Sequence, residues 1–171
     1  MAWQQDLFDV LIRQGIGIVA HVPDAGHSQL IKQCDQAESI RTVTLTSEQD
    51  GVGVLSGAWA GGIKGVLLMQ SSGVGNTVNA LSLAAIWRIP FLMLISMRGE
   101  WGEFIPWQVP MGQATPSVLA SMNVMVHRVD KADDVAPTAS SACEMTFSTR
   151  QATAVLLSQK LLGAKKFNAS K

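Results

Sequence analysis

Apolar and polar positions follow two kinds of pattern along this chain, which predict helices and strands in alternation. Apolar residues spaced three and four apart predict amphipathic helices, and short β-branched runs bounded by Gly, Pro or Asp predict strands. Residues 3–14 place Leu7 and Leu11 on one helical face, and Gly15 follows as a stop signal. The same patterns predict further helices at about 27–34, from 47 onward, 73–87, 116–122 and 133–150, and strands at about 16–22, 40–45, 65–70, 91–96, 124–129 and 152–157.

Several of these strands are apolar on both faces, which is typical of a parallel sheet covered by helices on both sides. We therefore expect a three-layer α/β sandwich with a parallel sheet of about six strands. One domain over residues 1–163 and a flexible basic tail at 164–171 account for the chain. Ligands of such sheets bind at the carboxyl ends of the strands. The loops after Val22, Leu45, Gln70 and Ser96 are the places to look for chemistry.

Composition narrows the function classes. The 171 residues are 47% hydrophobic and only 15% charged, with a formal net charge of zero, so neither a nucleic-acid surface nor a polybasic membrane contact is indicated. No apolar run approaches the roughly 18 residues that cross a bilayer. Two distant cysteines and no leader-like start predict a cytoplasmic protein with reduced thiols. So apolar a chain, with five Trp residues, also suggests a surface covered by a partner.

One glycine-rich turn allows a different chemistry. Gly73-Val-Gly75-Asn-Thr-Val78 follows a strand and opens a helix, as in dinucleotide-binding proteins. The third glycine is replaced by Val78, and no acidic residue for a ribose ends the next strand. A nicotinamide-dependent oxidoreductase remains an alternative on this evidence.

Glu48 is the informative acidic residue. It lies between a predicted strand and a helix that Ser47 opens, with Asp50 as a capping-box partner. That helix is rich in Gly, Ala and Ser, which costs helix propensity and suggests close approach of another group. An acid at this position can simply complement the helix dipole.

Three stretches, in this order and spacing, resemble the pyrimidine-binding domain of thiamine-diphosphate enzymes, and most closely the sulfopyruvate and phosphonopyruvate decarboxylase group. None is specific alone, but the likeness covers nearly the whole chain. The stretches are Val22-Pro23-Asp24, then Thr46 to Gly53 with Leu68 to Asn76, and lastly Arg98 to Glu103 with Gln108 to Gly112.

The resemblance implies a role for Glu48. In the family, a glutamate hydrogen-bonds N1′ of the aminopyrimidine and favours the tautomer whose amine removes the C2 proton of thiamine. An apolar site favours the protonated form of such a carboxyl, whereas a helix N-terminus favours the charged form. If the assignment is right, burial must therefore affect the Glu48 carboxyl group more strongly than the helix N-terminus does.

The family resemblance also implies a partner chain. Its diphosphate-binding half, which holds magnesium through Gly-Asp-Gly and Asn-Asn, has no counterpart here, so a separate beta subunit must supply it with the Mg²⁺. This chain has a partial match to that motif in Gln49-Asp50-Gly51 followed by Asn76. However, Gln49 replaces the first Gly, and Thr77 stands where the second Asn of the pair would be. Asp50 as a metal ligand is thus a weak alternative, and we expect no metal site in this chain.

Other site residues follow from position and resemblance. Gln70 ends a strand where relatives place a substrate-facing group, although it could equally bond loop backbone. Asp24 and His27 follow the first strand, near groups that relatives use for proton transfer, and His27 could also be a helix-surface residue. Pro23 and Asn76 are expected at the cofactor. Arg98 is expected to pair with an anionic substrate or to order its loop, and Trp101, Phe104 and Trp107 to pack that loop or an interface.

These expectations favour one function. The chain is interpreted as the alpha subunit of a two-subunit, thiamine-diphosphate-dependent carboxy-lyase. The resemblance implies an anionic 3-substituted pyruvate as substrate, with carbon dioxide and an aldehyde as products. A catalytically silent subunit of the same fold is the main alternative, and it should tolerate replacement of Glu48.

Overall fold

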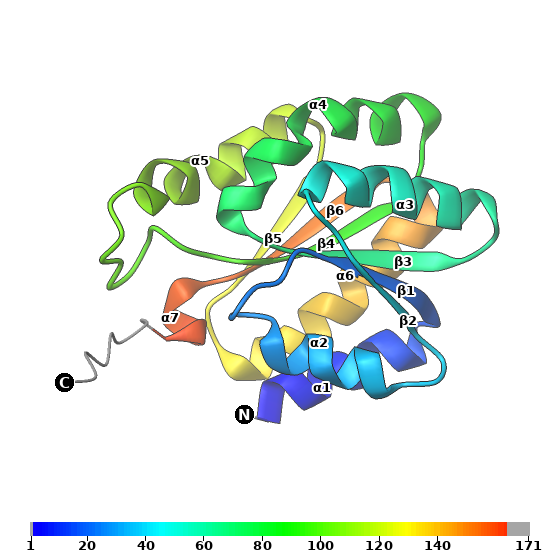
Figure 1. Cartoon of the computed structure of the whole chain (residues 1–171), viewed down its shortest axis with the longest axis horizontal. Helices are drawn as coiled ribbons and strands as arrows, with labels where there is room; N and C mark the ends of the chain where they lie inside the picture. Colours follow the sequence, from blue (N-terminus) through cyan, green and yellow to red (C-terminus); the bar gives the residue numbers. More distant parts are fainter. Residues whose placement is uncertain (1, 164–171) are drawn as a thin grey trace.

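The computed structural model describes residues 2–163, and the predicted tail at 164–171 lies outside the described residues. Six parallel strands form one sheet in the order β2-β1-β3-β4-β6-β5 (Figure 1). This confirms the expected parallel sheet. The strands are β1 (Ile16–His21), β2 (Arg41–Thr44), β3 (Lys64–Gln70), β4 (Phe91–Ser96), β5 (Met125–Val129) and β6 (Ala152–Leu157).

Helices cover both faces of the sheet, as expected for three layers (Figure 1). One layer holds α3 (Glu48–Ala60), α4 (Ser71–Trp87) and α5 (Gln108–Ser121). The other holds α1 (Ala2–Arg13), α2 (Ser28–Gln36) and α6 (Val135–Thr149), which follows a short 3₁₀ turn, η1 (Ala132–Asp134); α7 (Gln159–Leu162) follows β6. Within residues 2–163, no helix has the length and apolarity that a bilayer crossing requires.

The central strands are buried on both faces because their side chains alternate between two cores. In β3, Leu67 and Met69 pack with α3, α4 and α5, whereas Val66 and Leu68 pack with α1, α2 and α6. Every residue of β4 is buried. Continuous apolar runs therefore mark these strands, as the sequence predicted.

The small residues of α3 are explained only in part by close packing. A β-carbon on Gly51 would come within 2.6 Å of Leu67 Cδ1, so this glycine lets the helix approach the sheet. Gly53 and Gly57 have nothing within 4 Å of the corresponding position. The expected capping box is also incomplete, because Asp50 accepts a hydrogen bond from the Thr46 hydroxyl while Ser47 Oγ accepts one from the Gln49 amide.

Helix α5 is longer than the helix that the sequence predicts at about 116–122, and it includes residues expected to be irregular. The helix already begins at Gln108 and contains both Pro110 and Pro116. Pro110 lies in the first turn, where a missing N–H costs no helical hydrogen bond. Pro116 lies in the interior, and the neighbouring Thr115 hydroxyl bonds the Met111 carbonyl.

The sheet order creates a ligand crevice between β1 and β3. Strand β1 lies between β2 and β3, and the chain continues from β1 to β2 on one side but from β3 to β4 on the other. Such a switch point opens a crevice at the carboxyl ends of the strands. Glu48, Asp24 and Gln70 all follow or end strands at this edge.

Candidate active site

Glu48 is the first residue of α3, and its side chain turns inward beside α4. The residue is only 8% exposed. Its Oε2 accepts a hydrogen bond of 2.8 Å from Nδ2 of Asn76 on α4. The sequence predicted Glu48 and Asn76 as cofactor residues, and the fold brings their side chains together across two helices.

The first turn of α4 is shaped around this carboxylate. A β-carbon built on Gly73 would come within 2.7 Å of Glu48 Cγ and closer still to the carboxyl group. Gly73 is therefore a glycine because Glu48 occupies the space that a side chain would take. The same contact weakens the nicotinamide alternative, since the Glu48 side chain occupies the space over this turn that a pyrophosphate would need.

A cleft of about 130 Å³ lies at the β1–β3 switch point. It joins Glu48 with three other predicted residues, and its full lining is Val22, Pro23, Asp24, Glu48, Gln70 and Ser72. Pro23 and Val22 give it an apolar wall, and the carboxylates and amide give it a polar end. Four predicted residues from three separate segments of the chain thus converge on one site.

Asp24 and Gln70 form one hydrogen-bonded unit in the cleft. Gln70 Nε2 donates to Asp24 Oδ1 at 3.2 Å, and Gln70 Oε1 accepts from the Ser72 hydroxyl at 2.7 Å. Asp24 Oδ2 accepts from Ser96 Oγ and from the Gly26 amide. Ser72, in the first turn of α4, and Ser96, at the end of β4, were not predicted, because a serine at either position carries no signal of its own in the sequence.

His27 is buried and does not line the cleft. The residue is 2% exposed, and its Nε2 has no hydrogen-bond partner among the described residues. Burial lowers the pKa of this imidazole from its usual 6.5, and the charge of Asp24 offsets part of the effect. His27 does not occur in the lining of the cleft, so this placement gives no support to direct proton transfer.

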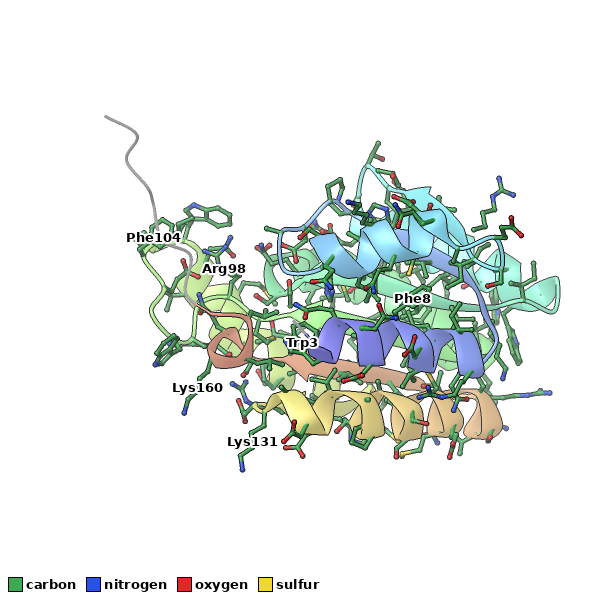
Figure 2. The ribbon with its side chains drawn as sticks, turned by 90° about the horizontal axis from the view of Figure 1, so that it is seen from below. Trp3, Phe8, Arg98, Phe104, Lys131 and Lys160 are labelled. Atoms are coloured by element: carbon green, nitrogen blue, oxygen red, sulfur yellow. The ribbon has the colours of Figure 1, made fainter. Side chains whose placement is uncertain are left out.

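Arg98 is held by a carboxylate of its own loop. Its Nε and Nη2 donate to Glu103 at 2.7 and 2.6 Å, and both side chains are buried. Figure 2 shows Arg98 and Phe104 at the same end of the molecule. Glu103 also accepts from the amides of Gly99 and Ile105 and from Gln159. This ion pair orders the loop between β4 and α5, and substrate binding by Arg98 stays a prediction.

Volume alone does not locate the site. A hollow of about 480 Å³ lies between the end of β1 and α2, and it shares Pro23 and Asp24 with the cleft. Another, of about 280 Å³, lies at the opposite edge of the sheet and is lined partly by Arg88 and Arg150. Neither contains Glu48. The small cleft is the candidate because it gathers the reactive groups.

Known proteins similar to this chain point to one family. The "Sulfopyruvate decarboxylase subunit alpha" of Methanococcus maripaludis is 33% identical over 152 residues, which cover 88% of this chain and 91% of the relative. The chain belongs to the sulfopyruvate decarboxylase alpha-subunit family. The subunit of that name from Methanothermobacter thermautotrophicus is 35% identical over 144 residues, covering 84% of this chain and 87% of the relative.

Other similarities extend the family picture. The "Phosphonopyruvate decarboxylase" of Streptomyces viridochromogenes is 32% identical over 85% of this chain but only 37% of its own length. A solved 2-oxoglutarate:ferredoxin oxidoreductase from Magnetococcus marinus shares the fold, with a TM-score of 0.73 and 13% identity over the whole chain and 34% of that structure's chain. No family model matches the sequence.

Proposed function

We propose that this chain is the pyrimidine-binding alpha subunit of a thiamine-diphosphate-dependent decarboxylase that acts on sulfopyruvate or a similar anionic pyruvate. The observation that carries the proposal is Glu48, buried at the β1–β3 switch point and held by Asn76 against Gly73. The names of the relatives support the reaction and the substrate class.

The residues of the cleft fit an aminopyrimidine ring. Glu48 would share a proton with a ring nitrogen, and Val22 and Pro23 would cover an apolar ring face. Thiamine diphosphate supplies, when bound, a carbanion that attacks a keto carbon and an electron sink for the departing carbon dioxide.

Asp24 and Gln70 are placed to act on the substrate side of the same cleft. They line it with Glu48, and their mutual hydrogen bond fixes both side chains. Gln70 would hold a polar group of the 2-oxo acid, and Asp24 is the proposed group for proton transfer to the product. Arg98 would lie near the anionic substituent of the substrate, since it borders a neighbouring hollow that also includes Asp24.

The cleft is too small to enclose the ligands without a partner. Small-molecule pockets usually measure about 300–1,000 Å³, whereas this cleft measures about 130 Å³. A beta subunit that binds the diphosphate and Mg²⁺ would complete it. Large exposed apolar side chains on α4 and on the loop before α5 offer surface for such a partner, namely Ile86, Trp87, Trp101 and Trp107.

Replacement of Glu48 tests the proposal. The chain is expressed with its native partner subunit, and carbon dioxide release from sulfopyruvate and from phosphonopyruvate is measured with thiamine diphosphate and Mg²⁺. Glu48→Gln keeps the volume and should lower kcat by about 100-fold or more, because it removes the shared proton. Subunit assembly should persist.

Asp50→Asn provides the matched control. Asp50 lies in the same helical turn but bonds Thr46 outside the cleft, so activity should be retained. Full activity of Glu48→Gln would instead favour the silent-subunit alternative. A markedly higher Mg²⁺ concentration required for activity in Asp50→Asn would place the metal in this chain and contradict the proposed division of labour.

A further inference from the structure

The last residue of β4 has a hydroxyl in an otherwise apolar strand. Ser96 follows Phe91-Leu92-Met93-Leu94-Ile95 and is 2% exposed. A hydroxyl buried this deeply needs a hydrogen-bond partner. Ser96 Oγ finds it in Asp24 Oδ2, to which it donates at 2.6 Å.

Sheet register explains why Ser96 and Gln70 reach the same carboxylate. The two residues are direct neighbours in the pairing of β3 with β4. Side chains of neighbouring residues in a parallel pair lie on the same face of the sheet. Asp24 therefore bridges two strand ends, with Oδ1 accepting from Gln70 and Oδ2 from Ser96.

The turn after β1 leaves room for this bridge. A β-carbon on Gly26 would come within 2.7 Å of Ser96 Cβ and 2.8 Å of Asp24 Oδ2. With no side chain there, the Gly26 amide can donate to the same Oδ2 at 3.0 Å. Asp24 is thus fixed by three donors from three segments of the chain.

We propose that Ser96 is a positioning residue, which orients the Asp24–Gln70 pair toward the Glu48 cleft. Ser96 does not line the cleft, whereas Asp24, Gln70 and Glu48 do. Ser96 therefore acts through Asp24, and Gln70 is fixed in turn between Asp24 and Ser72. The kinetic part of this inference rests on the proposed function, and the hydrogen-bond part concerns this chain alone.

The first test is structural and needs no activity. In the ¹⁵N-labelled full chain, the backbone amide of Gly26 and the side-chain amide of Gln70 report on the Asp24 carboxylate. Ser96→Ala should shift both resonances. Ser158→Ala is the matched control, because Ser158 is equally buried at the end of β6 and caps α7, and it should shift neither. Unchanged resonances in Ser96→Ala would overturn the inference.

The second test measures coupling in the assembled enzyme. Ser96→Ala should lower kcat by about tenfold, which is the scale expected from the loss of one hydrogen bond. The dissociation constant of thiamine diphosphate should change by less than about twofold, since Glu48 keeps its bonds. In an Asp24→Ala background, Ser96→Ala should have little further effect, because residues acting through one another are not additive.

The two tests distinguish a failure of the positioning role of Ser96 from a failure of the proposed function. Equal effects of Ser96→Ala in both backgrounds, or an unchanged kcat, overturn the positioning role. An inactive wild-type pair refutes the proposed function, while the amide resonances still decide the role of Ser96. If Ser96→Ala does not fold, Ser96→Cys keeps most of the volume with a weaker donor, and smaller shifts in the same direction are expected.

Discussion

The Glu48 carboxyl group lies directly over the backbone of Gly73, in the space that a β-carbon would need. The contact joins the N-terminal turns of α3 and α4, which belong to one layer. Asn76, one turn further along α4, donates to the same carboxylate. One helix thus supplies the acid and the next supplies both its space and its hydrogen bond.

Gly73→Ala should displace Glu48 and reduce cofactor-dependent activity by more than about tenfold. The helix itself should gain from alanine, so lost activity with retained folding would identify the steric effect. Gly75→Ala is the control, because a β-carbon there meets only Met111 Sδ at 3.5 Å. Activity and thermal unfolding are measured for both variants. Similar activity in the two would contradict the spatial role of Gly73.

Glu103→Gln should destabilise the chain by about 3 kcal/mol at pH 7, because it leaves the buried Arg98 without its partner. Hydrogen bonds from Arg98 and the loop amides hold the pKa of Glu103 well below its usual 4.5. The ionised carboxylate therefore stabilises the fold above pH 4.5, and this stabilisation declines as the pH falls below that value.

Urea unfolding at pH 7 and pH 3.5 checks this pH dependence. The difference between wild type and Glu103→Gln should be smaller at the lower pH. Glu38→Gln, at an exposed residue, should change the unfolding free energy by less than about 0.5 kcal/mol. If the difference in unfolding free energy between wild type and Glu103→Gln were larger at pH 3.5 than at pH 7, the predicted direction of the pH dependence would be wrong.

His27 should make the fold less stable as the pH falls below 6.5. Burial lowers its pKa in the folded chain, so the unfolded state takes up a proton first. The slope from one such group reaches at most about 1.4 kcal/mol per pH unit. His27→Leu should flatten the stability curve between pH 6.5 and 5.5. Since the pKa of His21 is lowered too, the comparison is made in a background that carries His21→Gln. Parallel curves of unfolding free energy against pH, with and without His27→Leu, would exclude the contribution of His27.

The two cysteines should be unreactive in the folded protein. Burial raises the pKa of both Cys34 and Cys143 to about 12, so very little thiolate exists at pH 8. An aromatic disulfide reagent should release no chromophore from the native chain and two equivalents after unfolding in guanidinium. Rapid native release of one equivalent would identify an accessible thiol.

Local sequence patterns determined most of the fold. Apolar runs such as 65–70 and 91–96 specify strands buried on both faces, because only a sheet covered on both sides can bury them. The position of Glu48 after a strand, and that of Gln70 at another strand's end, placed both at the ligand-binding edge. Only the part of α5 from Pro116 onward was predicted, since Pro110 reads locally as a loop signal and Pro116 as the start of a helix.

Tertiary structure alone decided which side chains meet. The sequence identified Glu48, Asp24 and Gln70 separately, but the sheet order brings them into one cleft. The register between β3 and β4 made Ser96 a hydrogen-bond partner of Asp24, and helix packing placed the Glu48 carboxyl group against Gly73. Loop folding paired Arg98 with Glu103. Local patterns report each residue's own backbone preference and burial, whereas these contacts depend on the distances between segments that only the folded chain sets.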